Sequence, residues 1–209
     1  MYVPKMFAVE EHETILRFMR ENPFAIIVSE QEGSMVATHM PVEVEQFASG
    51  ELVIRSHMAK QNPQWQSFEN GKEILVIFNG PHAYISSSWY DHINVPTWNY
   101  IAVHAYGTAK VLDRDATMEV LTRIVERYEA ASENPFTMNQ LSEEYLESHL
   151  KALVAFEVVV QRLEAKEKLS QNRNAHNIDL ITGQLEKSKH PDEQKIRQEM
   201  LRIHQKKIK

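Results

Sequence analysis

The chain lacks cysteine altogether and is poor in glycine, with 6 glycines among 209 residues. Without cysteine it can form no disulfide, no thiol nucleophile and no cysteine-based zinc site. The glycines do not form a Gly-x-Gly-x-x-Gly or P-loop motif, which disfavours the common nucleotide-binding folds. His-Glu-x-x-His and Gly-x-Ser-x-Gly motifs are also absent. We therefore expect neither a metal site nor a catalytic residue supplied by the protein itself.

Long hydrophobic runs are missing too. No stretch approaches 18 consecutive apolar residues, which argues against a membrane-spanning helix. The first residues lack the apolar core of a signal peptide, and the absence of cysteine is typical of the reducing cytoplasm. We expect a soluble, cytoplasmic protein without a membrane partner.

Positive charge is scarce in most of the chain and gathers at its end. Residues 1–160 contain 11 Lys and Arg against 22 Asp and Glu, whereas residues 161–209 contain 12 against 7. Such a basic segment either docks as solvated helices on an acidic body or binds nucleic acid. Docking is the preferred interpretation, with DNA as the alternative partner. The side chains that would contact DNA are Arg197, Arg202, Lys206, Lys207 and Lys209.

Short runs of β-branched and other apolar residues dominate the middle of the chain. Residues 24–28, 35–40, 52–57, 74–78, 100–112 and 153–160 are predicted strands, and the turn at 48–51 predicts a hairpin between the second and third. Helical spacing appears at residues 15–19, after Asp115 as a cap, at 143–150 and from 175 onward. We predict a mainly β, α+β fold: an antiparallel barrel over residues 1–170, with inserted helices, and a helical extension over 171–209 packed on it.

Aromatic and small polar residues are concentrated in residues 80–100. This segment holds two of the three tryptophans, three of the seven tyrosines and the run Ser86-Ser87-Ser88. Aromatic rings stack on a planar ligand, while hydroxyl and amide groups bind its edge. The segment therefore predicts the wall of a ligand site, with candidates Tyr84, Ser86, Trp89, Thr97, Trp98 and Asn99.

Basic and hydrogen-bonding residues form a second group of candidates. Residues 55–63 follow a predicted strand and open a predicted helix with Pro63 as its first residue, so cationic side chains meet free backbone amides. This pattern predicts an anion site at Arg55, Ser56, His57, Lys60 and Asn62. Two further groups follow predicted strands: Thr38 and His39, then Lys168, Ser170, Gln171 and Asn172. A stacking wall beside an anion site is suited to a phosphorylated flavin such as FMN.

Five blocks of the sequence resemble the PaiB family of FMN-binding split-barrel proteins. They are Ala-Thr-His-Met-Pro at 37–41, His-Met-Ala-Lys-Gln-Asn-Pro-Gln-Trp at 57–65, Phe-Asn-Gly-Pro-His-Ala-Tyr-Ile-Ser at 78–86, Val-Pro-Thr-Trp-Asn-Tyr at 95–100 and Lys-Leu-Ser-Gln-Asn at 168–172. The resemblance implies a six-stranded Greek-key split barrel that forms a homodimer with FMN at the subunit interface. It also implies a repressor, a negative transcriptional regulator of sporulation and of degradative enzyme (protease) synthesis.

Two other functions remain open at this point. A flavin-dependent oxidoreductase of the same barrel type needs no catalytic residue of its own, because the flavin carries the hydride. A haem-binding or haem-degrading split-barrel protein is the third hypothesis, with His39, His57, His82 and His104 as the histidines near the expected site.

Overall fold

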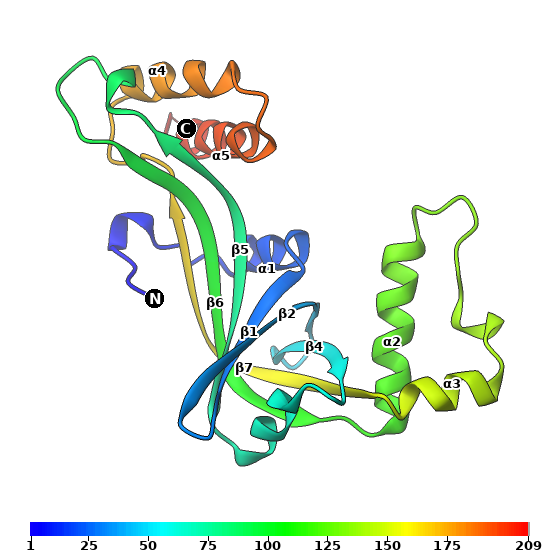
Figure 1. Cartoon of the computed structure of the whole chain (residues 1–209). Helices are drawn as coiled ribbons and strands as arrows, with labels where there is room; N and C mark the ends of the chain where they lie inside the picture. The colour runs from blue at the N-terminus through cyan, green and yellow to red at the C-terminus, as the bar shows by residue number, and fades with distance from the viewer. Residues whose placement is uncertain (209) are drawn as a thin grey trace. The chain divides into compact units, whose positions relative to one another are not determined.

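The computed structural model describes residues 1–208, with side chains through residue 205 (Figure 1). Within this range seven strands form one sheet in the order β2-β1-β5-β6-β7-β4-β3. The strands are β1 (Phe24–Gln31), β2 (Ser34–Pro41), β3 (Glu43–Gln46), β4 (Leu52–Ala59), β5 (Glu73–Ile85), β6 (Thr97–Val111) and β7 (Leu153–Lys168). The predicted number of strands, six, is wrong.

Five α-helices and four short 3₁₀ helices complete the described part of the chain. The α-helices are α1 (His12–Glu21), α2 (Arg114–Glu129), α3 (Glu143–Leu150), α4 (Ala175–Glu186) and α5 (Pro191–Ile208). The 3₁₀ helices are η1 (Lys5–Phe7), η2 (Pro63–Asn70), η3 (Ser87–Trp89) and η4 (Met138–Gln140). Asp113, not Asp115, caps α2: its carboxylate accepts a hydrogen bond from the Ala116 amide at 2.9 Å.

Two tight hairpins explain the difference between the predicted and observed strands. Glu32 and Gly33 have φ of 51° and 80°, the left-handed pair that a two-residue turn between β1 and β2 needs. The turn at 48–51 joins β3 to β4, not β2 to β4 as predicted. Strand β3 has the sequence Glu-Val-Glu-Gln, and Val44 is its one buried residue, so its hydrophobic signal was too weak to identify it.

The chain divides into two compact units that share the three longest strands. The first unit contains Met1–Phe18, Asn79–Val103 and the chain from Glu164 onward, and the second contains Met19–Phe78 and His104–Leu163. The end of β5, the start of β6 and the end of β7 therefore belong to the first unit, together with α4 and α5. This division differs from the boundary at residue 170 that the sequence suggested.

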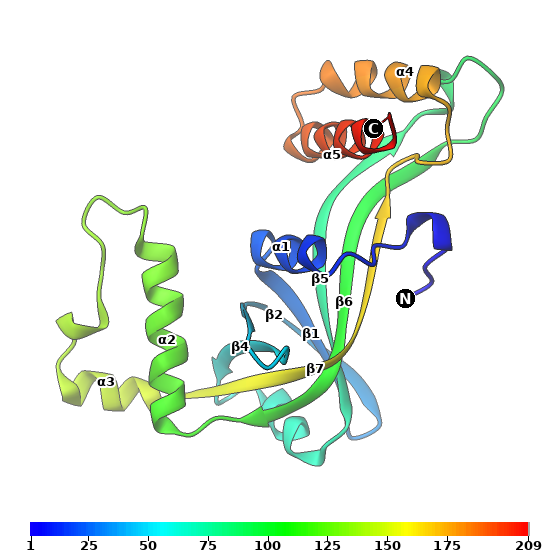
Figure 2. The same ribbon diagram turned by 180° about the vertical axis from the view of Figure 1, so that it is seen from behind.

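The core of the first unit lies between strand ends and the last two helices, which run side by side (Figures 1 and 2). Ala83 and Ile85 of β5 and Ile101 of β6 supply the sheet side of this core. The helices supply Ile178, Ile181, Leu185, Ile196 and Met200. Burial of these side chains holds α4 and α5 against the sheet, because apolar area removed from water is the main stabilising term.

The core of the second unit gathers side chains from five elements. Ile27 of β1, Ile54 of β4 and Val76 of β5 are each 1% exposed. Phe68 of η2 packs on Phe156 of β7 with ring centroids 4.7 Å apart. This contact fixes η2 on the sheet, and with it the loop that carries residues 60–62.

Candidate functional site

A pocket of about 120 Å³ in the first unit brings together residues from three parts of the sequence. We call it the first-unit pocket. Five of its lining residues are predicted cofactor ligands: Thr97, Asn99, Lys168, Ser170 and Asn172. The others are Phe7, Tyr90, Val95, Pro96 and Arg173. Strands β6 and β7 are neighbours in the sheet, which is why the start of β6 and the end of β7 meet here.

Lys168 is the central cation of the first-unit pocket. Strand β7 runs through Lys168, further than predicted, so this side chain leaves from a rigid strand and not from a loop. Its ammonium group donates a hydrogen bond to the Thr97 hydroxyl on β6. Burial lowers the pKa of Lys168, because desolvation disfavours the charged form. A bound anion would restore a charge partner to this cation.

A tight turn after β7 positions the remaining polar residues. Ser170 has φ of 61° and is buried, and its hydroxyl accepts a hydrogen bond from the Asn99 amide at 3.0 Å. Gln171 accepts a hydrogen bond from the Leu169 amide at 2.7 Å. Asn99, Ser170 and Gln171 therefore brace the turn, which leaves Asn172 as the exposed amide beside the pocket.

Two hydrogen-bonding residues of the first-unit pocket, Tyr90 and Arg173, are not among the ligands predicted from the sequence. The Arg173 guanidinium lies 5.2 Å from the centroid of the Tyr90 ring and donates a hydrogen bond to Asn94 at 3.4 Å. The Tyr90 hydroxyl is buried and has no hydrogen-bond partner among the described residues. Arg173 directly follows the predicted run 168–172, and this position was the available signal. Ammonium, guanidinium, amide and hydroxyl donors together fit a phosphate group.

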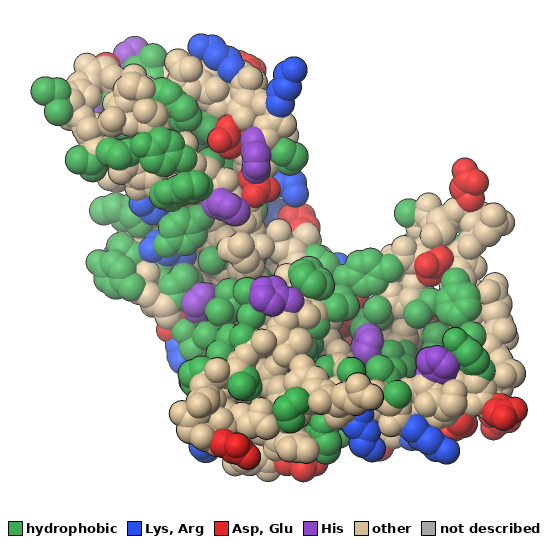
Figure 3. Space-filling model, in the orientation of Figure 1, with side chains coloured by type: hydrophobic (Ala, Val, Ile, Leu, Met, Phe, Trp, Pro, Cys, Tyr) green, Lys and Arg blue, Asp and Glu red, His purple; other side chains and the backbone are tan. Residues whose placement is uncertain are grey.

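Exposed aromatic rings lie on neighbouring strands of the same unit. Tyr84 on β5 and Trp98 on β6 have ring centroids 5.8 Å apart in an edge-on arrangement, and they are 44% and 52% exposed. His82 lies 6.0 Å from Trp98. Ile93 and Val95, in the loop between these strands, are exposed as well. Figure 3 shows hydrophobic side chains standing out from the surface at this end of the sheet.

Two residues of the predicted aromatic wall have structural contacts. Ser86 caps η3, where its hydroxyl accepts a hydrogen bond from the Ser88 amide at 3.2 Å. Trp89 packs against the core beneath α4 and α5. The indole of Trp89 therefore contributes to the stability of the first unit, unlike the more exposed Trp98.

In the second unit, two predicted ligands belong to a hydrogen-bond network around Gln64. Thr38 donates to the Gln64 side chain at 2.5 Å and accepts from Asn62 at 2.9 Å. The Gln64 amide donates to the Ile27 carbonyl oxygen at 3.2 Å. Asn62 also caps η2, as its position before Pro63 predicts. These contacts tie η2 to β1 and β2.

Two residues of the predicted anion site at the end of β4 have partners within the protein. The Arg55 guanidinium pairs with Glu157 at 3.0 Å and with Glu45 at 2.9 Å, so carboxylates of the protein already neutralise it. Ser56 is fully buried and donates a hydrogen bond to the Pro41 carbonyl oxygen at 2.6 Å. The sequence did not reveal the carboxylate on β7, which pairs with β4 antiparallel and lies opposite Arg55. Both side chains have structural contacts, and their part in cofactor binding stays a prediction.

The other second-unit candidates differ in exposure. His39 is exposed on β2, with its ring 6.4 Å from that of Phe24. Lys60 is exposed and lines a separate pocket of the second unit. His57 has a buried Nδ1 atom with no hydrogen-bond partner in the described part of the chain. Their part in cofactor binding stays a prediction.

His57 predicts a measurable dependence of stability on pH. Burial lowers the pKa of His57, so between its native pKa and its ordinary value of about 6.5 the unfolded chain binds more protons than the native state. The His57 contribution to stability is therefore complete above about pH 6.5 and is lost as the pH falls. We expect the free energy of unfolding to fall by up to about 1.4 kcal/mol for each pH unit below that value.

Urea unfolding between about pH 5.5 and 7.5 tests this dependence, since histidines titrate in that range. The His57→Gln variant should lose that part of the pH dependence. The His190→Gln variant, which changes an exposed histidine, should retain it. Equal pH profiles for the wild-type protein and His57→Gln would show that burial of His57 has no such effect.

The basic residues of the C-terminal segment are partly neutralised. Arg197 pairs with Glu186 at 2.6 Å, and Arg202 pairs with Glu167 at 2.8 Å and with Glu199 at 2.5 Å. Of the remaining DNA candidates, Lys209 and the side chains of Lys206 and Lys207 lie outside the described residues. No helix in the described range is long and apolar enough to cross a membrane. Nor do residues 1–205 bring together three His, Asp or Glu side chains that could hold a metal ion.

Known proteins similar to this chain were found by sequence and by structure. The family model described as "Putative FMN-binding domain" matches residues 1–162. The "Protease synthase and sporulation protein PAI 2" of Bacillus subtilis is 44% identical over 192 residues, which cover 92% of each chain. This chain thus spans nearly the whole of that relative.

Solved structures confirm the predicted fold class. The flavocytochrome Anf3 from Azotobacter vinelandii superimposes with a TM-score of 0.64 at 15% identity, covering 85% of this chain and 78% of that one. The FAD and heme binding protein from Mycobacterium smegmatis has a TM-score of 0.59 at 17% identity, covering 82% and 78%. At these identities the likeness is one of fold: a split β-barrel with peripheral helices.

Proposed function

The chain belongs to the PaiB family of FMN-binding domains, and on that premise we propose that it is an FMN-binding negative regulator of protease production and sporulation. Membership confirms FMN as the cofactor predicted from the sequence. The regulatory part of the proposal is supported by the name of the Bacillus subtilis relative and by its match over nearly the full length of both chains.

The observation that carries the assignment of the cofactor site is the composition of the first-unit pocket. Its lining places the ammonium group of Lys168, the guanidinium of Arg173 and the amide of Asn172 around one cavity. The unpartnered Tyr90 hydroxyl adds a donor that the protein leaves unused among its described residues. We assign these four groups to the FMN phosphate, because charged donors form the strongest hydrogen bonds to phosphate oxygens.

The first-unit pocket is too small for the whole cofactor. Its volume of about 120 Å³ is below the ~300–1,000 Å³ of typical small-molecule sites, so only part of FMN would be enclosed. The exposed rings of Tyr84 and Trp98 offer a surface on which the flavin ring can stack. We propose that a second copy of the chain completes the site and covers these rings, which makes the active form a homodimer. When bound, FMN supplies a redox-active ring, whose oxidation state can follow the redox state of the cell.

We propose that regulation does not depend on a DNA contact through Arg197 and Arg202. Each guanidinium already pairs with a carboxylate, so binding to DNA phosphates would require breaking an existing ion pair. We therefore propose that regulation acts through the bound flavin and a protein partner. A gel-shift titration of the purified protein with promoter DNA tests this part: binding that weakens steeply with added salt would overturn it, because phosphate contacts release counterions.

The experiment combines cofactor binding with a cellular measurement. The purified protein is titrated with FMN by fluorescence quenching, and size-exclusion chromatography with light scattering gives its mass. A deletion strain is then assayed for secreted protease, with complementation by the wild-type gene or by an Arg173→Ala gene. We expect FMN binding by a dimer, increased protease secretion on deletion, and restoration by the wild-type gene but not by Arg173→Ala.

Other outcomes would assign the protein differently. Unchanged protease secretion on deletion would end the regulatory proposal while leaving the cofactor assignment standing. Rapid reduction of the bound flavin by NADH or NADPH, with turnover on an added acceptor, would favour the oxidoreductase alternative. A monomer that binds FMN tightly would contradict the shared site.

A further inference from the structure

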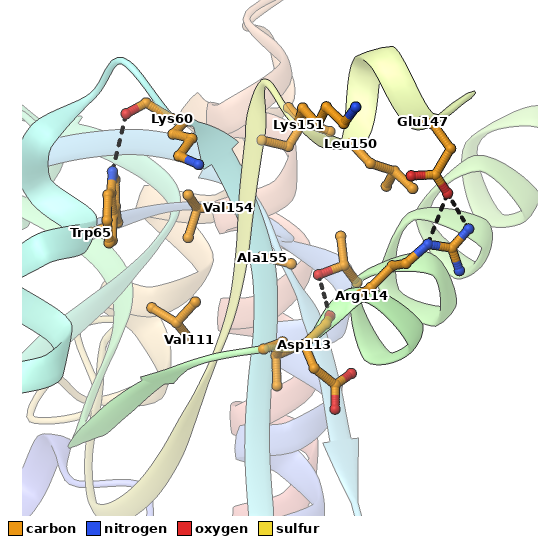
Figure 4. A pocket seen from close by; sticks show the side chains of 13 residues that line it. Lys60, Trp65, Val111, Asp113, Arg114, Glu147, Leu150, Lys151, Val154 and Ala155 are labelled. Carbon is orange, nitrogen blue, oxygen red and sulfur yellow. Dashed lines mark hydrogen bonds and ion pairs between the residues drawn. The ribbon is translucent and has the colours of Figure 1, made fainter. Parts of the chain in front are cut away.

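The second unit contains a larger pocket, of about 380 Å³, in which Lys60 is the one lining residue that the cofactor prediction includes (Figure 4). We call it the helical-insert pocket, because α2 and α3 form one side of it. The end of β6, the start of β7 and the loop after β4 form the rest. Its lining residues are Lys60, Trp65, Val111, Leu112, Asp113, Arg114, Thr117, Glu147, Leu150, Lys151, Leu153, Val154 and Ala155.

The interior of the helical-insert pocket is apolar. Val111 and Leu112 come from β6 and the residue after it, Leu150 ends α3, and Val154 and Ala155 belong to β7. Val154 and Ala155 are 8% and 1% exposed, so they form a rigid floor within the sheet. A volume of about 380 Å³ with an apolar lining lies within the usual range of small-molecule sites, ~300–1,000 Å³.

Most polar groups around this pocket are already bound within the protein. The Arg114 guanidinium pairs with Glu147, with Nε at 2.8 Å from the carboxylate. The Asp113 carboxylate caps α2, and the Thr117 hydroxyl donates to the Asp113 carbonyl oxygen at 2.6 Å. Arg114 and Glu147 neutralise each other and keep α2 and α3 together, whereas Asp113 keeps its negative charge at the wall of the pocket.

Two lysines are the exception. Lys60 and Lys151 have no carboxylate within ion-pair distance among the described residues, although residues 1–160 carry twice as many acidic as basic side chains. The Lys60 amide donates to the Ala152 carbonyl oxygen at 2.8 Å, which places Lys60 beside the residue that follows Lys151. Figure 4 shows both side chains next to the start of β7. The Trp65 indole donates to the Lys60 carbonyl oxygen at 3.0 Å and fixes the loop.

We propose that the helical-insert pocket binds a small amphipathic carboxylate, such as a medium-chain fatty acid. Its hydrocarbon part lies on Leu150, Val154 and Ala155, where burial of apolar surface drives binding. Its carboxylate pairs with either Lys60 or Lys151, whose ammonium groups lie on opposite sides of the start of β7 in Figure 4. This assignment gives Lys60 a role other than the flavin-phosphate contact predicted from the sequence.

Isothermal titration calorimetry of the FMN-loaded protein with dodecanoate, and with dodecanol as the uncharged analogue, tests the proposal. We expect dodecanoate to bind at one site per chain and the double variant Lys60→Gln/Lys151→Gln to lose about tenfold in affinity for it. Affinity for dodecanol should be unchanged in that variant. Lys195→Gln, which changes an exposed lysine in the first unit, is the matched control and should bind both probes as the wild type does.

A third variant separates the apolar floor from the charged rim. Leu150→Gln should weaken binding of dodecanoate and dodecanol alike, since it removes apolar contact and leaves both lysines in place. Circular dichroism of each variant establishes that it is folded before it is compared. The two ligands and three variants therefore give distinct patterns for the rim, the floor and the surface control.

Several results would overturn the proposal. Absence of dodecanoate binding would do so, as would equal affinity in the double variant and the wild type. Competition between FMN and dodecanoate, together with weaker FMN binding by Lys60→Gln, would show that this pocket belongs to the cofactor. Saturable dodecanoate binding to protein already loaded with FMN would support a second, independent ligand site.

Discussion

Replacing Lys168 with alanine is expected to weaken FMN binding by about 10- to 100-fold and to leave riboflavin binding nearly unchanged. The loss corresponds to roughly 1.5–3 kcal/mol, the usual size of a hydrogen bond to a charged group. Lys168 is held on β7 by the Thr97 hydroxyl, and burial lowers its pKa, so the protein keeps a poorly solvated cation in the first-unit pocket. A bound phosphate compensates the Lys168 cation for its lost hydration, whereas riboflavin carries no phosphate.

Fluorescence quenching with FMN and with riboflavin measures both affinities on the same protein. Arg173→Ala should show the same selectivity, because its guanidinium lines the same pocket. Lys72→Ala is the control, since Lys72 is an exposed lysine of the second unit that pairs with Glu30. If Lys168→Ala lost affinity for FMN and riboflavin equally, or kept its full affinity for FMN, the phosphate would bind elsewhere.

Replacing Gly107 with alanine is expected to lower the free energy of unfolding by about 1–3 kcal/mol or more, the usual cost of overpacking a filled core. Gly107 lies in β6, where a Cβ atom would be 2.1 Å from the carbonyl oxygen of Val159 and 3.1 Å from Cα of Val160. These are backbone atoms of the neighbouring strand β7, so no side-chain rotation can relieve the clash. The two strands would have to separate locally and lose hydrogen bonds of the sheet.

Gly183 provides a matched control for this prediction. It lies within α4, and a Cβ atom there would meet nothing within 4 Å. Gly183→Ala should therefore stabilise the protein by roughly 0.5–1 kcal/mol, because alanine is the better helix former. Thermal unfolding of both variants is sufficient, since 1 kcal/mol shifts the midpoint by roughly 2–4 °C in a chain of this size. A Gly107→Ala protein as stable as the wild type would mean that β6 and β7 lie further apart.

Hydrophobic periodicity predicted most of the elements because it reflects local physics. β-branched runs at 24–28, 52–57 and 153–160 became β1, β4 and β7, and Pro63 began η2 as its fixed φ favours. The failures have local causes as well. β3 has a single buried residue, Val44, and α2 is capped by Asp113 while the sequence offered Asp115 two residues later.

The candidate site was predicted less completely than the fold. Lys168, Thr97 and Asn172, three of the residues predicted from the sequence, line one pocket, although Thr97 and Asn172 lie 75 positions apart. Residue type could not show that Arg55 is neutralised by Glu157, since that contact depends on the pairing of β4 with β7. Nor could it show that Tyr90 and Arg173 stack, because this requires the turn after β7 to bring them together.

By itself the amino-acid sequence determined the class of the protein: a cysteine-free, mainly β chain with the blocks of an FMN-binding family. Those properties follow from composition, periodicity and short motifs, which act over a few residues. Only the tertiary structure decided which of its cations remain available to a ligand. A cation is available when no carboxylate from a distant strand or helix reaches it, and such pairs form only when the sheet and helices assemble.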